Sequence, residues 1–258
     1  MVVLHGSGLN GPNMARWSGL AESGPNAGFL TVFPDALDEI WDDQGLGRVD
    51  GADDAGFVAE LIEHLVGNSS ASANGITLVG LSNGAFFAER LARHGLVRST
   101  SLVLVAGTAR EVSRRSAPAP ANPTPVLLFE GTADPLVPYQ GGAASGPMAW
   151  LARRRARRHL VSPGRRESVG AETIAADWAA TNRCHPIPAV DLLATAARDA
   201  PVERLTWSAP QAQPVVLYKI NGGGHGWPGG PQYVPAVLVG RIPRHLDATR
   251  ILLDFVHR

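Results

Sequence analysis

A serine set between glycines is the first group in this sequence that could do chemistry. The segment Gly80–Gly84 reads Gly-Leu-Ser-Asn-Gly, and it lies between the apolar run Ile76–Val79 and a helical pattern at Ala85–His94. This context is typical of a nucleophile elbow, in which glycines let strand and helix approach closely while the serine hydroxyl stays exposed. We therefore predict that Ser82 is a nucleophile. The plainer alternative is an ordinary β–α turn.

A serine hydroxyl reacts poorly until a base takes its proton, so a histidine and an orienting carboxylate should follow. Asp134 comes soon after one apolar run, and His225 lies in the glycine-rich segment Gly222–Gly230 after another. The order serine, acid, histidine is that of α/β enzymes with a nucleophile elbow. We predict that Asp134 orients His225 and that His225 is the base. The alternatives are an Asx turn and a solvated loop histidine.

Acyl transfer also needs N–H groups that stabilise the negative oxygen of the transition state. One donor is expected at Asn83, the residue after the predicted nucleophile, and the other in the loop His5–Gly8. We favour Ser7 as the second donor, with Gly6 and Gly8 as alternatives. The same loop could be a strand-ending turn or a phosphate nest, but no glycine motif of nucleotide-binding proteins accompanies it.

Metal catalysis is the other route to ester hydrolysis, and the sequence gives it little support. Neither His-Glu-x-x-His nor paired cysteines occur, and the acidic stretch Asp50–Asp54 lacks the spacing of a calcium loop. Capping of a helix by Asp53 and Asp54 explains that stretch. We expect no metal and no cofactor.

The elements that must position these residues alternate along the chain. Expected strands are Val2–Leu4, Phe29–Phe33, Ile76–Val79, Leu102–Val105, Val126–Phe129 and Val215–Ile220. Expected helices are Met14–Glu22, Asp54–Val66, Ala85–His94, Val169–Ala180 and Leu246–Val256. Alternation of continuously apolar strands with helices predicts an α/β fold with a mostly parallel sheet covered on both faces.

Composition sets further bounds on this 258-residue chain. Its length fits one domain, 1–258, and its 45% hydrophobic content is that of a globular protein. With 23 basic and 23 acidic residues, nucleic acid is not an expected partner. No apolar run approaches the roughly 20 residues of a membrane span. Cys184 is the single cysteine, so no intramolecular disulfide is expected.

Residues 137–168 interrupt the α/β pattern with a glycine pair and the basic run Arg153–Arg158. We expect a solvated surface or lid-like insertion beside the active site. A docking patch for an anionic polymer is the alternative, although charge runs usually face water.

With these residues assembled, the chain resembles the polyhydroxybutyrate depolymerase and feruloyl esterase group of α/β-hydrolases along nearly its whole length. The motifs that carry the resemblance are Leu4–Gly6, Phe33–Asp35, Trp41 with the acidic stretch after it, Asp54–Val58, Gly80–Gly84, Gly131–Tyr139 and Gly222–Gly230. The resemblance implies an α/β-hydrolase fold and a secreted or envelope serine esterase without a cofactor. It implies the same roles for Ser82, Asp134 and His225. The chain shows no signal peptide, so we assign no compartment.

The sequence departs from that group in three places. Ser7 stands where depolymerase-like members often carry cysteine, Gly226 stands where many carry threonine, and no polymer-binding domain follows. Small soluble esters are therefore expected substrates ahead of insoluble polyester. Trp41 and Trp227 are candidates for the substrate pocket or for ordinary packing.

We therefore expect a serine carboxylesterase that hydrolyses feruloyl or acetyl esters, hydroxyalkanoate oligomers or small soluble esters through an acyl-enzyme. The alternatives are a peptidase or thioesterase on the same three residues, and a non-catalytic binding protein of the same fold.

The chain opens directly on the expected core strand Val2–Leu4, without the antiparallel edge strands that usually precede it in α/β-hydrolases. We expect those first edge strands to be missing, through a natural start or a truncation. Phe29–Phe33 would then be a bare sheet edge through which homo-oligomers could form.

Overall fold

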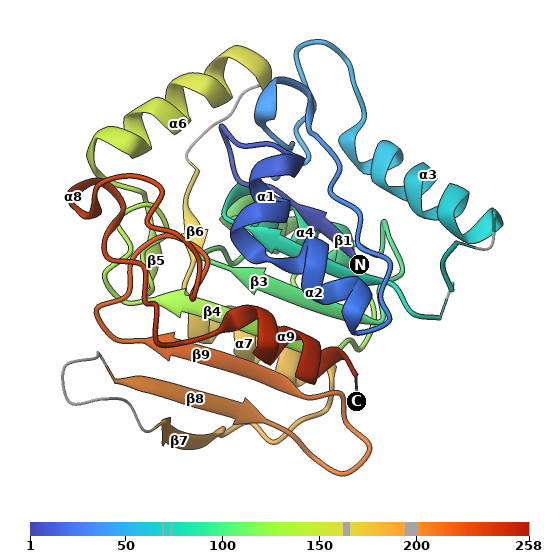
Figure 1. Cartoon of the computed structure of the whole chain (residues 1–258), viewed down its shortest axis with the longest axis vertical. Helices are drawn as coiled ribbons and strands as arrows, with labels where there is room; N and C mark the ends of the chain where they lie inside the picture. Colours follow the sequence, from blue (N-terminus) through green and yellow to red (C-terminus); the bar gives the residue numbers. More distant parts are fainter. Residues whose placement is uncertain (69, 73, 162–165, 194–200, 258) are drawn as a thin grey trace.

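A mostly parallel seven-stranded sheet forms the centre of the protein (Figure 1). The computed structural model describes residues 1–257 apart from 69, 73, 162–165 and 194–200. The strand order is β1-β2-β3-β4-β9-β8-β7; the first five run parallel, and β8 and β7 are antiparallel additions at one edge. The strands are β1 (Val2–Leu4), β2 (Thr77–Leu81), β3 (Ser101–Val105), β4 (Val126–Gly131), β7 (Ala189–Leu193), β8 (Val202–Trp207) and β9 (Val215–Ile220).

The parallel strands form because their side chains are apolar on both faces and both faces are covered. In β2, β3 and β4 every residue is buried. Val79 pairs with Val103 and Val103 with Leu127, so one row of apolar side chains crosses these strands. This rigid centre fixes where the loops at the strand ends lie.

Helices cover both faces of the sheet. They are α1 (Gly11–Ser18), α2 (Leu20–Asn26), α3 (Asp54–Gly67), α4 (Asn83–Arg93), α5 (Glu111–Ser116), α6 (Gly146–His159), α7 (Ala171–Thr181), α8 (Ala236–Val239) and α9 (Ala248–Val256). One face packs against α3, α4 and α7 through residues such as Phe87 and Trp178. The other packs against α1, α2 and α9 through residues such as Met14 and Leu252. The predicted α/β arrangement is confirmed.

The expected strand Phe29–Phe33 is wrong. Only Val32 forms a bridge, to Val2, through hydrogen bonds from Val3 N to Val32 O and from Val32 N to Met1 O, both 2.8–2.9 Å. Phe29 packs its ring against the apolar cluster of the α9 face instead of extending a ladder. Strand β1, three residues long, is thus the last strand of the sheet on this side.

The expected insertion 137–168 contains two short strands and a helix. Strands β5 (Gly141–Gly142) and β6 (Ser168–Val169) pair with each other apart from the main sheet, and α6 lies between them in the chain. Figure 1 shows α6 near α8, on the side where the parallel strands end. Residues 162–165 of this segment lie outside the described residues.

Among the described residues, no helix is long and apolar enough to cross a bilayer.

Candidate active site

Ser82 occupies the sharp turn between β2 and α4. Its φ of 54° and ψ of −119° place it in a backbone region that side chains rarely adopt. Glycine is required on both sides, because a Cβ at Gly80 would lie 2.3 Å from the Gly84 carbonyl oxygen and a Cβ at Gly84 would lie 2.3 Å from the Leu4 oxygen. The glycines of the predicted elbow therefore let β1, β2 and α4 meet behind the serine.

His225 lies between Ser82 and Asp134. Its Nε2 is 2.8 Å from Ser82 Oγ, and its Nδ1 is 2.7 Å from Asp134 Oδ2. A carboxylate only accepts hydrogen bonds, so this arrangement favours a proton on Nδ1 and leaves Nε2 free to accept one from the serine. The structure thus brings together the three residues that the sequence singled out.

The two partners of Ser82 are themselves held by backbone groups. Asp134 Oδ1 accepts hydrogen bonds from the N–H groups of Leu136 and Val137, at 2.7 and 2.9 Å. The N–H of His225 donates to Val239 O at 2.6 Å. These contacts fix the carboxylate and the imidazole on loops that follow β4 and β9.

The expected oxyanion donors lie beside Ser82. A Cβ at Gly6 would be 3.3 Å from Ser82 Cβ, and both Ser7 and Asn83 line the same cleft as Ser82. Asn83 opens α4, so its N–H is one of those that a helix leaves without an intrahelical acceptor. Gly8 is the weaker alternative to Ser7, because its N–H donates to Glu39 O at 2.9 Å.

The side chain of Asn83 has a second function that the motif does not show. Its Oδ1 accepts from Trp41 N at 2.8 Å, and its Nδ2 donates to Trp41 O at 3.2 Å. The amide thus fastens the start of α4 to the loop that carries Trp41. Because these two residues are far apart in the chain, no local sequence pattern predicts their contact.

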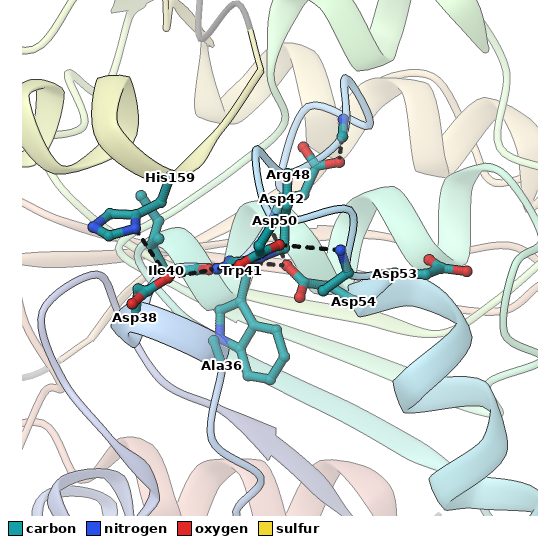
Figure 2. Close-up of polar contacts among 12 residues, drawn as sticks. Ala36, Asp38, Ile40, Trp41, Asp42, Arg48, Asp50, Asp53, Asp54 and His159 are labelled. Carbon is teal, nitrogen blue, oxygen red and sulfur yellow. Dashed lines mark hydrogen bonds and ion pairs between the residues drawn. The ribbon is translucent and has the colours of Figure 1, made fainter.

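Trp41 does not line the cleft, and the idea that it forms a substrate pocket is wrong. Its side chain is fully buried, stacks on Phe87 with ring centres 5.1 Å apart, and donates from Nε1 to His5 O at 3.1 Å. Figure 2 shows its indole turned away from the surrounding acidic side chains. Trp41 is a core residue under the His5–Gly8 loop.

Trp227 is likewise a packing residue. It is 2% exposed, belongs to the apolar cluster on the α9 face, and donates from Nε1 to Thr249 Oγ1 at 2.9 Å. Tyr233 is an aromatic residue that does line the cleft; its hydroxyl donates to His225 O at 3.2 Å and its ring stacks on Trp17. Tyr233 lies in a loop without a recognisable motif, so the sequence did not reveal it.

The acidic stretch after Trp41 is organised by one buried arginine (Figure 2). Arg48 binds Asp38 and Asp50, each at 2.9 Å, and lies 3.8 Å from Asp54. Burial raises the pKa of Asp54 to about 6. Asp53 caps α3 through the N–H groups of its first turn, as expected.

None of the described residues form a cluster of three or more histidines, cysteines or acids that could hold a metal ion.

Ser82 and His225 open onto a cleft of about 1040 Å³, which we call the Ser82 cleft. Ser7, Ser82, Asn83, Phe86 and His225 form part of its wall. Arginines of α6, together with Arg110 and Arg166, form much of the rest. The cleft is large enough for a small-molecule substrate.

Comparison with solved structures identifies the fold. An acetyl xylan esterase from Aspergillus awamori superposes with a TM-score of 0.52 over 85% of this chain and 82% of its own, at 11% sequence identity. The protein has the α/β-hydrolase fold. SOBER1 from Arabidopsis thaliana, at 15% identity, superposes with a TM-score of 0.35 over 60% of this chain and 81% of its own.

Sequence comparison adds one relative for this chain. A protein of Nocardia uniformis subsp. tsuyamanensis, named "Putative esterase NocK", is 28% identical over 263 residues, covering 99% of this chain and 73% of that protein. No family model matches the chain.

Proposed function

We propose that this protein is a serine carboxylic ester hydrolase. The observation that carries the proposal is the position of His225, whose two ring nitrogens lie 2.8 Å from Ser82 Oγ and 2.7 Å from Asp134 Oδ2. The likeness to a Nocardia protein named as an esterase, over nearly the whole chain, supports the same reaction class.

The geometry suits acyl transfer in two steps. Ser82 Oγ attacks the ester carbonyl carbon while His225 Nε2 takes its proton, and Asp134 stabilises the imidazolium. The N–H groups of Ser7 and Asn83 stabilise the oxyanion. His225 then gives the proton to the leaving alcohol, which leaves an acyl-enzyme on Ser82.

Hydrolysis of the acyl-enzyme repeats the steps with water. His225 removes a proton from the water, the hydroxide adds to the acyl carbon, and the proton returns to Ser82 Oγ as the carboxylic acid leaves. No cofactor takes part in either half of this reaction. Feruloyl and acetyl esters, hydroxyalkanoate oligomers and small soluble esters are the candidate substrates.

The test is hydrolysis of p-nitrophenyl acetate and butyrate by the wild type and by Ser82→Ala. We expect the substitution to lower kcat/KM by about 10³-fold or more, because the nucleophile, base and acid act as a unit. Equal activity of the two proteins would refute the proposal.

Two further measurements separate the alternatives. A fluorophosphonate probe should label the wild type and not Ser82→Ala; absence of labelling in the wild type would indicate a non-catalytic protein. Amide and thioester analogues of the same acyl group should be turned over more slowly than the oxygen ester, whereas faster turnover would indicate a peptidase or a thioesterase.

A further inference from the structure

Two arginines and one carboxylate form a buried cluster in the wall of the Ser82 cleft. Arg110 contacts Asp43 Oδ2 through Nε and Nη2, both at 2.8 Å, and Arg166 Nη2 contacts the same oxygen at 2.6 Å. The side chains of Arg110, Arg166 and Asp43 are 10%, 11% and 0% exposed. We call these three residues the Arg110–Arg166 cluster.

The Arg110–Arg166 cluster carries an excess of positive charge. Two guanidinium groups share a single carboxylate, so one positive charge within the cluster remains uncompensated. Burial lowers the pKa of Arg110 to about 10, which still leaves it charged near neutral pH. Both arginines line the cleft, whereas Asp43 does not.

One donor of the cluster is unused. Within the described part of the chain, Arg166 Nη1 is buried and has no hydrogen-bond partner. A buried charged donor without a partner is costly, and a ligand oxygen would remove that cost. The ion pair with Asp43 accounts for the position of Arg166 Nη2, but it gives Nη1 no hydrogen-bond acceptor. Asp43 Oδ1 also lacks a partner, but it belongs to the residue that does not line the cleft.

The cluster lies close to the nucleophile helix. The Arg110 guanidinium carbon is 3.6 Å from the centre of the Phe86 ring, and Phe86 N donates to Ser82 O at 3.0 Å in the first turn of α4. Phe86, Ser82 and both arginines line the same cleft. A group bound by the arginines can therefore belong to a substrate whose ester bond lies at Ser82.

The charges around the cleft favour the same kind of ligand. Two of its acidic residues are neutralised: Glu39 pairs with Arg155 at 2.6 Å, and Asp38 binds Arg48 at 2.9 Å. Glu167 is a third acid in the lining. Arg157 and Arg158 on α6 also line the cleft, and neither has a carboxylate partner among the described residues. Cationic walls concentrate anionic substrates.

We propose that the Arg110–Arg166 cluster binds a carboxylate of the substrate, so that the enzyme acts on esters that carry a free carboxylate several atoms from the bond it cleaves. A planar guanidinium suits a carboxylate because it can donate two parallel hydrogen bonds. This inference rests on the proposed esterase function and names the substrate class of that site.

The experiment uses pairs of esters that differ only in charge. Monomethyl adipate ends in a carboxylate, and methyl adipamate ends in a neutral amide of nearly the same shape; the glutarate and suberate pairs vary the distance to the ester. We expect the wild type to show about tenfold higher kcat/KM for the acid of the best pair, because one charge-assisted hydrogen bond supports a preference of that order. Added salt should weaken this preference for the acid.

Substitutions then locate the preference. Arg166→Gln should bring the acid-to-amide ratio close to one, and Arg166→Lys, which keeps the charge and loses the fork, should give an intermediate ratio. Arg115→Gln is the matched control, because Arg115 is a 77% exposed arginine on α5 that does not line the cleft. It should keep the wild-type ratio. Circular dichroism establishes that each variant is folded.

The outcomes separate the two proposals. Equal rates for acid and amide in the wild type across all three chain lengths would overturn the carboxylate site and leave the esterase intact. A preference that persists in folded Arg166→Gln would overturn it as well. Failure to hydrolyse either member of any pair, with no labelling of Ser82, would instead refute the esterase proposal. The wild-type ratio decides the matter even if Arg166→Gln does not fold.

Discussion

Trp41 shows how a single residue can support the site without touching the cleft. Its ring lies between His5 and Phe87, with centre distances of 5.2 and 5.1 Å, and its backbone holds both polar atoms of the Asn83 amide. Its position beneath the predicted oxyanion loop makes it a support for that loop. Substitution should therefore affect stability and not the choice of substrate.

We predict that Trp41→Phe lowers the free energy of unfolding by about 1–3 kcal/mol, because the buried His5 carbonyl oxygen loses its Nε1–H donor. The ratio of p-nitrophenyl acetate to butyrate hydrolysis should stay at its wild-type value. Urea denaturation and initial rates measure the two quantities. Trp150→Phe, at a 57% exposed position on α6, is the control and should change neither. A changed acyl preference at unchanged stability would return Trp41 to the substrate pocket.

Glu130 is a buried acid behind the turn that carries Ser82. Its Oε1 accepts from Gly107 N at 2.9 Å, and its Oε2 has no partner among the described residues. Burial raises the pKa of Glu130 well above its usual range. A group whose pKa is higher in the folded state binds its proton more tightly there, so folding is favoured at low pH and the advantage is lost as the pH rises.

We predict that Glu130→Gln, which stays neutral, gains stability relative to the wild type as the pH rises from 5 to 9. Glu130→Ala should cost about 2 kcal/mol or more at pH 5, since Gly107 N loses its acceptor and a cavity forms. This cost should shrink as the pH rises, because only the wild type loses stability through Glu130. Urea unfolding at several pH values measures both. If the difference in the free energy of unfolding between the wild type and Glu130→Gln did not change from pH 5 to 9, Glu130 would not be protonated in the folded protein.

At the scale of elements, α4 is anchored at the end remote from Ser82 by a buried ion pair. Arg93 Nε donates to Glu89 Oε1 at 2.6 Å, and both side chains are fully buried. Arg93 also donates to the carbonyl oxygens of Ala117 and Pro118 and lies 3.5 Å from Asp177 of α7. One guanidinium thus joins α4, α7 and the segment after α5.

We predict that Arg93→Ala destabilises the protein by about 3–5 kcal/mol, because Glu89 keeps a buried charge without a counter-charge. Adding Glu89→Gln to that variant should recover part of the loss. The matched control is Arg115→Ala, which breaks a pair of the same i,i+4 spacing with Glu111 on the surface and should cost less than about 1 kcal/mol. If urea unfolding showed similar losses of stability in Arg93→Ala and Arg115→Ala, the buried Arg93–Glu89 pair would not anchor α4.

The elements most easily predicted from the sequence were those with the strongest local patterns. Buried parallel strands are continuously apolar, so β2, β3, β4 and β9 were found within two residues of their observed ends. Strands β7 and β8 were missed because they mix apolar and charged residues and owe their place to pairing with β9. No strand forms at Phe29–Phe33, because the neighbouring strand β1 is only three residues long and offers few backbone groups for pairing.

The residues around the Ser82 cleft also differ in how well the sequence alone predicts them. Ser82, Asp134 and His225 could be predicted because strained turns and glycine-rich loops leave a local signature. The roles of the two tryptophans could not, since an indole in a loop looks the same whether it points into a pocket or into the core. The Arg110–Arg166 cluster is assembled from distant segments of chain, and only the folded structure joins them.

At the scale of the whole molecule, the three central residues stand at the ends of strands in one sheet. Ser82 follows β2, Asp134 follows β4 and His225 follows β9. Strands β4 and β9 are immediate neighbours, paired in parallel from Val126 with Val215 to Gly131 with Ile220. Asp134 and His225 are thus held at the ends of two directly paired strands.

Strands β5 and β6 pair with each other apart from the main sheet, Gly141 with Val169 and Gly142 with Ser168. Residues 143–167 therefore leave and return at one place in the fold, and this segment can be lengthened, shortened or replaced while Asp134 and His225 keep their positions after β4 and β9. Arg166 belongs to this segment, and Arg110 lies outside it. Exchange of this one contiguous piece would therefore change the wall of the Ser82 cleft and leave the arrangement of Ser82, His225 and Asp134 intact.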